Sequence, residues 1–589
     1  MNSILSYKNT SLALATISSL TMMACGPTNN DDNAKTNTAQ AKLIECSDFG
    51  SDLTLTDDVD GGVDYIVDCE AAVRGELIIE PGVIIQFKED AGFDVSGEGT
   101  ITAEGTAEKP IVFTAEEQVA GFWKGFYISS GSVKNKLDHV EFEYAGGEQF
   151  NSNGDKGSII LYSGGQLSLT NSLITKSANF GLNNNYEAEL TFSNNTITES
   201  ELQPISIEAN LMGEIDSESQ LTGNGKDFVR VTSGYVEDIE ATWKKLTVPY
   251  QIKSSIDISG ESAITVEAGA EFVFAEDTGI EVSDGSYFAA QGTAEEHVIF
   301  TGEVEEKGSW NGFMFHSNDV KNSLDYVTVD YAGGGSFNSN DDRGAVMMYA
   351  DSRLILTNST ISNSKEYGFN VNYSVEDLTF SNNTITGCEK EPVAVQVGNI
   401  HQLDSESQLT GNTKDYVRLH SSYASATGVT GQWNKLTVPY LFAADTDFNI
   451  TDESVVNVEA GTEFRFAANA GLEVDDDSSF SAVGTSEAKI QFLGIDETAE
   501  SWKGIMFYSN DTKNRLEHVN IKYAGSGSFN SNGDEGGLII YADAQVTIKD
   551  VEISDSGDCA ISAEYESSVL IEEGTNVLTG LLAGICLPD

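Results

Sequence analysis

Short runs of alternating hydrophobic and polar residues recur along most of the chain. From Val140 to Tyr144 hydrophobic residues alternate with glutamates, and similar runs begin at Val327 and Val519. A two-residue period predicts a strand with one inward and one outward face, and no segment combines a sustained 3.6-residue apolar period with helix caps. The chain is therefore predicted to be all-β, with the inward positions Val140, Phe142, Tyr144, Val327, Val329, Tyr331, Val519, Ile521 and Tyr523.

A long repeat organises these strands. The segment that begins at Trp123 returns from Trp310 and again from Trp502, at offsets of 187 and 192 residues. Internal repetition of this kind is typical of solenoids. It predicts three tandem modules of about 190 residues. Their boundaries are 44–244, 245–434 and 435–589, the last with a C-terminal cap.

A finer period lies within each module. LSLTNSLITKS starts at Leu167 and LTFSNNTITES at Leu190, 23 residues later. Each unit reads as a strand, a polar turn and a second strand, which suits a coil whose neighbours pair in parallel. This pattern resembles the pectin-lyase-like right-handed parallel β-helix superfamily over residues 44–586. The resemblance implies a fold and no single activity, because that fold hosts lyases, hydrolases, adhesins and inert scaffolds.

The N-terminus reads as a targeting segment. An apolar stretch within residues 1–24 is too short to span a bilayer stably and ends in Met22-Met23-Ala24-Cys25. This motif resembles the lipobox of bacterial lipoproteins, which implies cleavage before Cys25 and lipid attachment to it. Residues 25–43 then form the lipidated cysteine and a flexible tether. Gly26, where an aspartate would favour inner-membrane retention, points to an exported protein anchored at the outer membrane or cell surface.

The chain is strongly acidic. It carries 32 Lys and Arg against 93 Asp and Glu, a net charge of −61. Such a chain is not expected to bind nucleic acid, which requires basic side chains to neutralise phosphates. The acidity fits either solubility in salty water or attraction for cations and basic partners.

The cysteines fall into pairs about one coil apart. Cys46 and Cys69 are 23 residues apart, and Cys559 and Cys586 are 27 apart. In an exported protein such pairs are candidate disulfides between neighbouring coils. Cys388 has no partner at such a distance and is expected to be a buried thiol.

One loop in each module exceeds the length of a normal coil. From Val140 to Ile174 the chain runs 34 residues, and the eleven residues beyond a 23-residue coil include Phe-Asn-Ser-Asn. With seven or eight coils per module, the three loops are expected on the order of 35–40 Å apart, a spacing suited to multivalent binding. The candidate contact residues are Phe150, Asn151, Asn153, Asp155, Phe337, Asn338, Asn340, Asp342, Phe529, Asn530, Asn532 and Asp534.

Three interpretations of this loop stand side by side. Asn, Asp and Gly stabilise turns, so the loop can be purely structural, with Phe seating it on the solenoid. Alternatively, Phe offers an apolar face to a sugar ring while Asn and Asp bind hydroxyls. Oxygen-bearing residues at alternate positions also resemble the start of a calcium loop. Apart from this possible calcium, the sequence indicates no cofactor or metal site.

The repeated tryptophans, Trp123, Trp310 and Trp502, are read mainly as core residues, with sugar stacking as the alternative. No histidines have zinc-ligand spacing, and no basic residue recurs at an outward position where a polysaccharide lyase would need its base. The leading hypothesis is a non-enzymatic surface protein that binds an extracellular polymer, a glycan. The alternatives are a polysaccharide lyase or glycoside hydrolase on the same fold, whose carboxylate pair would be hidden among many, and a structural spacer.

Overall fold

The computed structural model describes residues 40–184, 188–283, 285–337, 341–373, 375, 377–475, 477–529, 533–557, 559–564, 569–572, 574–580 and 583–587. The chain divides into two units, residues 1–40 and 41–589, and the fold belongs to the second. The predicted signal peptide and Cys25, with the tether up to residue 39, lie outside the described residues. Among the described residues, no helix has the length and apolar character that a membrane crossing requires.

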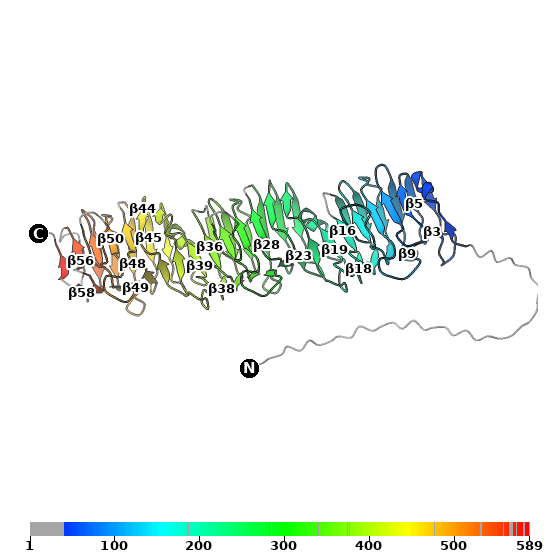
Figure 1. Ribbon diagram of the computed structural model, residues 1–589. Helices are drawn as coiled ribbons and strands as arrows, with labels where there is room; N and C mark the ends of the chain where they lie inside the picture. The colour runs from blue at the N-terminus through cyan, green and yellow to red at the C-terminus, as the bar shows by residue number, and fades with distance from the viewer. Residues whose placement is uncertain are drawn as a thin grey trace, which may run out of the picture. The chain divides into compact units, whose positions relative to one another are not determined.

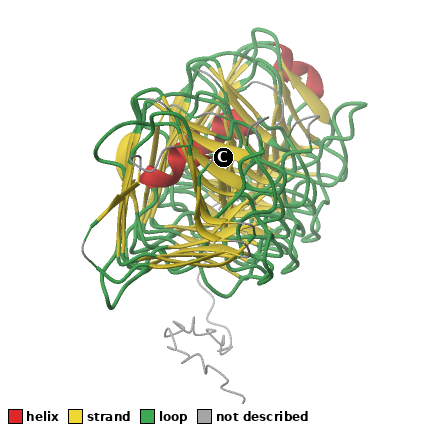
Figure 2. Cartoon of the chain, turned by 90° about the vertical axis from the view of Figure 1, so that its left-hand side faces the viewer, coloured by secondary structure: helices red, strands yellow, loops and turns green. Residues whose placement is uncertain are grey.

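Three short strands make one coil of a solenoid. In the first module, β7 (Gly92–Val95), β8 (Thr100–Glu104) and β9 (Ile111–Ala115) form one coil, and β10 (Gly125–Ile128) then pairs in parallel with β7. Successive coils lie side by side in Figure 1, and the view in Figure 2 shows their strands as the walls of the solenoid. The predicted parallel β-helix is confirmed, because the described strands pair in parallel throughout.

Three of these parallel sheets carry the repeated strands that matter below. Sheet 1 consists of β4 (Glu70–Val73), β7, β10, β13 (Ile159–Leu161), β16 (Leu182–Asn184), β19 (Ile205–Ile207), β20 (Val229–Val231), β23 (Tyr250–Ile252), β26 (Glu271–Phe274), β29 (Val298–Gly302), β32 (Val327–Asp330), β35 (Thr360–Ser362) and β38 (Thr384–Thr386). Sheet 2 consists of β21 (Tyr235–Glu237), β24 (Ile256–Ser259), β27 (Gly279–Val282), β30 (Gly312–Phe315), β33 (Val346–Met348), β36 (Phe369–Val371), β39 (Val393–Val395), β40 (Val417–Leu419), β43 (Tyr440–Phe442), β46 (Glu463–Phe466), β49 (Ile490–Gly494), β52 (Val519–Lys522), β55 (Glu552–Ser556) and β58 (Val577–Gly580). Sheet 3 consists of β41 (Ser425–Thr427), β44 (Asp447–Thr451), β47 (Gly471–Val474), β50 (Gly504–Phe507), β53 (Leu538–Ile540), β56 (Cys559–Ala563) and β59 (Ala583–Cys586).

Four further sheets complete the walls. They run from β1 (Lys42–Leu43) to β18 (Thr196–Thr198), from β2 (Leu53–Leu55) to β17 (Glu189–Ser193), from β22 (Glu240–Trp243) to β37 (Asp377–Ser381), and from β42 (Thr430–Trp433) to β57 (Val569–Ile571).

Equivalent strands of successive modules lie in different sheets. The strands β7, β27 and β47, which begin at the equivalent glycines Gly92, Gly279 and Gly471, belong to sheets 1, 2 and 3 respectively. Within sheet 1, seven steps lead from β7 through β10, β13, β16, β19, β20 and β23 to β26, and β27 follows on the next face of the coil. Sheet 2 repeats this arrangement from β27 to β46. One module therefore spans seven full coils and one further strand position, which is one wall of the solenoid. Equivalent residues of successive modules consequently lie on different walls.

Two short 3-10 helices mark the places where the sheets change. Helix η2 (Ala209–Glu214) lies against β17, the last strand of its sheet, and against β21 and β22, which start two new sheets. Helix η3 (Val397–Gln402) lies in the same way against β37, β41 and β42. We call these two places the first and second module junctions.

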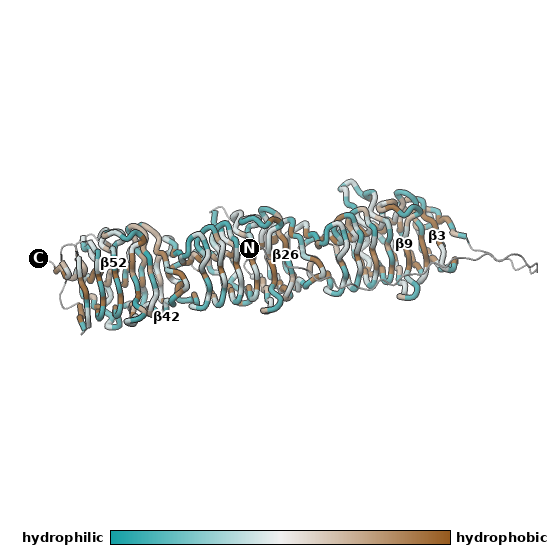
Figure 3. Tube along the Cα trace, turned by 90° about the horizontal axis from the view of Figure 1, so that it is seen from below, coloured by the Kyte–Doolittle hydropathy of each residue, from teal (hydrophilic) through white to brown (hydrophobic). Residues whose placement is uncertain are grey.

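The core follows the predicted alternation. In β12 (Val140–Glu143), Val140 and Phe142 are buried while the two glutamates are only partly covered, and Val327, Val329, Val519 and Ile521 are buried in the other modules. Figure 3 shows hydrophobic residues along the strands and hydrophilic ones at many of the turns.

The tyrosine at the end of this run departs from the prediction in two modules. Tyr144 is buried, but Tyr331 and Tyr523 are only partly buried. All three have positive φ values, between 60° and 69°, and follow directly after the strand. Full burial is therefore confirmed only for Tyr144, while Tyr523 packs against the core from a partly exposed position.

The repeated tryptophans are core residues. Trp123, Trp310 and Trp502 are fully buried and stack on Phe87, Phe274 and Phe466, with ring centroids 4.1, 4.2 and 4.0 Å apart. Each indole N–H donates a 2.8 Å hydrogen bond to a backbone carbonyl, that of Glu143, Asp330 or Lys522. Burial on all sides leaves no ring face for a sugar.

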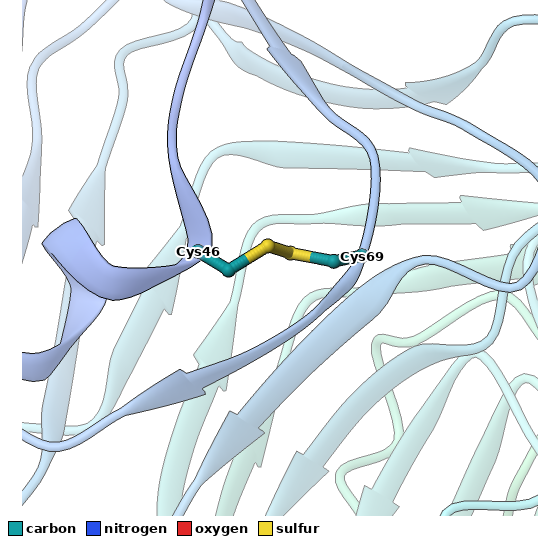
Figure 4. The surroundings of a disulfide bond; sticks show 2 residues. All are labelled: Cys46 and Cys69. Carbon is teal, nitrogen blue, oxygen red and sulfur yellow. A yellow bond between two sulfur atoms is a disulfide. The ribbon is translucent and has the colours of Figure 1, made fainter.

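Disulfides link coils near both ends of the solenoid. Cys46, at the start of η1 (Cys46–Gly50), is bonded to Cys69 just before β4 (Figure 4). Cys559 in β56 is bonded to Cys586 in β59, the next strand of sheet 3. The segment expected to be a C-terminal cap thus contributes a further strand. Cys388 is a buried thiol, and burial raises its pKa to about 11.

The tryptophan stack predicts a local effect of substitution. Trp310→Ala removes the ring from a closed core and is expected to cost about 3–5 kcal/mol. Because each coil of a solenoid contacts mainly its neighbours, amide hydrogen exchange should accelerate in β26, β30 and β32 and stay unchanged in β7 and β10. Trp310→Phe, which keeps a stacking ring, should give a smaller change. Uniform acceleration through all modules would contradict this local picture.

Candidate functional site

The Phe-Asn-Ser-Asn loops lie between the strands β12 and β13, β32 and β33, and β52 and β53. In each copy the phenylalanine ring rests on the glycine that opens a strand of the preceding coil: Phe150 on Gly92, Phe337 on Gly279 and Phe529 on Gly471. The ring occupies the space that a Cβ would need, so only glycine fits beneath it. The phenylalanines therefore seat the loops on the solenoid, and all three stay partly exposed.

Polar contacts complete the loop in the first module. The Asn151 amide donates to the Asp155 carboxylate at 3.1 Å, and the Asn153 backbone N–H donates to Asn151 Oδ1 at 3.1 Å. The Asn153 amide donates to the Tyr162 hydroxyl at 2.9 Å. These bonds bring three of the predicted residues together as a turn.

The other two copies are described in part. Asp342 and Asp534 are partly exposed, whereas Asn338, Asn340, Asn530 and Asn532 lie outside the described residues. A calcium site at these loops stays a prediction. Within the part of the chain that the structure describes, the grouping of three possible metal-ligating His, Cys, Asp or Glu side chains is Cys46, Asp68 and Cys69, and its two sulfurs form the first disulfide.

A basic residue covers the phenylalanine in two copies. The Lys124 ammonium lies 5.4 Å from the Phe150 ring centroid and pairs with Glu70 at 2.7 Å. In the third module Lys503 lies 5.2 Å from Phe529. The middle module has Asn311 instead, whose Oδ1 accepts a 2.7 Å hydrogen bond from the Gly335 N–H of the loop. The aligned Lys, Asn and Lys side chains thus help to anchor each loop.

Each module carries a row of closely spaced aromatic rings, and the first row contacts its loop. In the first row, Phe150 lies 5.7 Å from Tyr127, which lies 5.4 Å from Tyr162. The Asn153–Tyr162 hydrogen bond joins this row to the loop. Tyr127 lies in β10 and Tyr162 directly follows the neighbouring strand β13, so the spacing of the coils brings their tilted rings close together.

The second and third rows share with the first the tyrosine that directly follows a strand, Tyr349 and Tyr541 in place of Tyr162. The second row runs from His316 through Tyr349 and Tyr373 to Tyr423, with centroid separations of 4.8, 4.6 and 5.5 Å. The third row contains Tyr508 and Tyr541, 4.8 Å apart.

Sequence reasoning missed these rows, although a signal was present. Tyr162, Tyr349 and Tyr541 each follow a hydrophobic triplet and recur at offsets of 187 and 192 residues, the offsets of the tryptophans. The rows lie at strand ends of sheets 1, 2 and 3 respectively, so each faces outward from a different wall of the solenoid.

A groove of about 440 Å³ lies beside the first loop. Asp155 and Lys156 from the loop face Asn183, Glu208 and Arg230 from strands β16, β19 and β20 or the turns after them. The groove therefore carries both charges, and the basic residues come from the loop and from the sheet.

The corresponding place in the second module is more tightly packed. Glu391 is almost fully buried, with Lys414 and Arg418 at 3.6 and 3.7 Å. Burial, with Arg418 nearby, lowers the pKa of His420 to about 4, and its Nε2 lies 2.9 Å from Asn370 Oδ1. A neutral imidazole in this position donates a hydrogen bond to the amide oxygen, so the two side chains stabilise each other.

Comparisons with known proteins add no function: no protein-family model matches the chain, and neither a curated protein nor a solved structure matches it.

One carboxyl near the third loop has a strongly shifted pKa. Burial, with the charges of Asp475 and Asp447, raises the pKa of Glu473 from 4.5 to about 7. The Lys503 ammonium donates hydrogen bonds to both carboxylate oxygens of Asp447, at 2.8 and 2.7 Å. Its positive charge is therefore paired mainly with Asp447.

This shift predicts a pH-dependent stability. Between pH 4.5 and about 7 the folded chain holds a proton on Glu473 that the unfolded chain releases, so stability falls as the pH rises through this window. Glu473→Gln should therefore raise the thermal midpoint at pH 8 and leave it unchanged at pH 4, as measured by circular dichroism. Glu98→Gln, at an exposed turn, is the control. A midpoint gain of equal size at both pH values would argue against the titration of Glu473.

Proposed function

We propose that this protein is a lipid-anchored, non-enzymatic surface protein that binds an extracellular glycan polymer. The contact surfaces are the Phe-Asn-Ser-Asn loops together with the aromatic rows. The observation that carries the proposal is the recurrence of partly exposed, closely spaced aromatic rings in all three modules, which in the first module contact the loop. Flat aromatic faces with polar edges suit sugar rings, which offer C–H faces and hydroxyl rims.

The position of the three rows shapes this function. A row on each of three walls would bind separate chains of a polymer, or one chain wound around the solenoid, in preference to one straight chain along one side. Several weak sites on one body raise the total strength of attachment without any tight single site. The high negative charge favours an uncharged or basic polymer, since acidic polysaccharides are repelled.

The anchor is a separate part of the proposal. The Met22-Met23-Ala24-Cys25 motif places a lipid on Cys25, and the polar segment after it would hold the solenoid away from the membrane. Localisation at the outer membrane or cell surface follows from this anchor. A protein fixed in this way would attach a cell to a polymer, which is adhesion.

Substitution of the rings tests glycan binding. The triple variant Tyr162→Ala, Tyr349→Ala, Tyr541→Ala should fold normally and lose about tenfold or more of its signal on a glycan array, because each row loses a stacking face. The triple variant Phe150→Ala, Phe337→Ala, Phe529→Ala should lose binding as well, through unseated loops. Val133→Ser with Val320→Ser, at exposed positions outside the rows and loops, is the matched control.

The array is run with and without a calcium chelator. Loss of binding in chelator would assign calcium to the loops, and equal binding would leave the loops free of it. The absence of any glycan bound by the unmodified chain would contradict the proposed function and favour the spacer. Release of new reducing or unsaturated sugar ends would favour an enzyme.

Replacement of Cys25 tests the anchor. The unmodified chain expressed in a Gram-negative host should partition into the detergent phase of Triton X-114 and carry acyl mass on its N-terminal peptide. Cys25→Ser should lose both properties, whereas Cys388→Ser, at a buried thiol, should keep both. Equal partitioning of the Cys25→Ser variant would contradict lipid anchoring.

A further inference from the structure

A pocket of about 510 Å³ opens at the second module junction, where the second aromatic row ends. Residues of helix η3, of β41 and of the start of β42 line this pocket. The volume falls in the range of small-molecule sites. Gln396, His401, Tyr423, Ser425 and Thr427 are among the residues that line it.

The lining of this pocket is uncharged, although 21% of the chain's residues are charged. Amide, imidazole, hydroxyl, aliphatic and aromatic groups line it, with no Asp, Glu, Lys or Arg among these described residues. The groove beside the first loop and the hollow at the first junction both include acidic side chains. An uncharged lining in so acidic a protein favours a neutral ligand, because a charged one would lose its hydration without a counter-charge.

The amide of Gln396 indicates what the ligand must offer. The residue is only 3% exposed, and neither Oε1 nor Nε2 has a hydrogen-bond partner among the residues that the structure describes. A buried amide left unpaired in this way costs free energy, and native proteins pair nearly all such groups. One acceptor and one two-proton donor, side by side, match vicinal hydroxyls, which both donate and accept.

An aromatic ring also lines the pocket. Tyr423 is 57% exposed, and its ring lies 5.5 Å from that of Tyr373 in the second row. The two rings meet edge to face, and an exposed ring of this kind offers a flat apolar face to a ligand. The described lining thus combines an aromatic ring with hydroxyl-binding groups and includes no carboxylate or ammonium, and the charge that acts on it through His401 is that of Asp377.

We propose that this pocket binds one or two residues of an uncharged sugar, with Tyr423 against the sugar's C–H face and Gln396 bonded to its hydroxyls. The inference rests on the proposed function in one respect: the second aromatic row would lead a glycan chain into the pocket. It adds the ligand class, neutral sugars, and a specific site outside the loops.

The first junction provides a matched control. Tyr235 corresponds to Tyr423 in the repeat and is 77% exposed. However, the hollow there is lined by Glu189, Leu211 and Glu214 among others, and Tyr235 is not part of it. The same substitution at Tyr235 therefore changes an exposed tyrosine without changing the pocket.

Saturation-transfer NMR on the full mature chain tests the proposal, with glucose, galactose, mannose, N-acetylglucosamine and their β-1,4-linked disaccharides as probes, and glucuronate as the charged comparison. At least one neutral sugar should bind, and glucuronate should not. Tyr423→Ala and Gln396→Leu should each weaken the binding about tenfold, whereas Tyr235→Ala should leave it unchanged. Circular dichroism of each variant checks the fold.

Two results would overturn the pocket: no neutral sugar bound by the unmodified chain, or binding that survives both Tyr423→Ala and Gln396→Leu. These are distinguishable from failure of the proposed function. If the tyrosine triple variant keeps its full array signal while Tyr423→Ala abolishes sugar binding, the pocket stands and the role of the rows falls. If the tyrosine triple variant loses its array signal while Tyr423→Ala leaves sugar binding unchanged, the role of the rows stands and the pocket proposal is contradicted.

Discussion

Parallel hydrogen bonding between successive coils is the constraint on which every other feature depends. Each strand must pair with the strands one coil before and one coil after, so a residue type that recurs once per coil becomes a row in space. The stacked indole and phenyl rings inside, and the tyrosine rows outside, are two results of this one rule. The seating of Phe150 on Gly92 is a third, since it needs the loop of one coil to reach the strand of another.

The module junctions modify this rule and thereby determine where the surfaces face. At η2 and η3 two sheets end and two begin, while sheet 1 or sheet 2 continues without a break. The continuing sheet carries the backbone bonds across the junction, and the repeat resumes one face further round. Three similar modules thus present similar surfaces in different directions. The second junction also forms the uncharged pocket, so the same irregularity that rotates the repeat creates a distinct site.

Alternation and internal repetition sufficed to predict the strands, the parallel coils and the burial of residues such as Phe142 and Trp310, because these follow from local period and hydrophobicity. The rotation at the junctions was not predictable in this way. A repeat shows that β7 and β27 are alike, but sheet membership depends on how many faces lie between them. The role of Tyr349 was also missed, since a tyrosine after a hydrophobic triplet reads as a strand end. Phe150 was predicted as a loop residue, and only the structure shows the glycine beneath it.

The continuity of sheet 1 through the first junction is the claim that the account needs most. Engineered cysteines can test it, because Arg230 of β20 pairs with Gln251 of β23 where the first module meets the second, and both are partly exposed at a spacing that a disulfide spans. The account predicts oxidative cross-linking of an Arg230→Cys, Gln251→Cys variant and none for Gln251→Cys with Thr198→Cys, because Thr198 lies in β18, the last strand of the sheet that holds β3, the equivalent of β23. Cross-linking of the second pair in place of the first would contradict the one-face rotation, and with it the placement of the three rows on different walls.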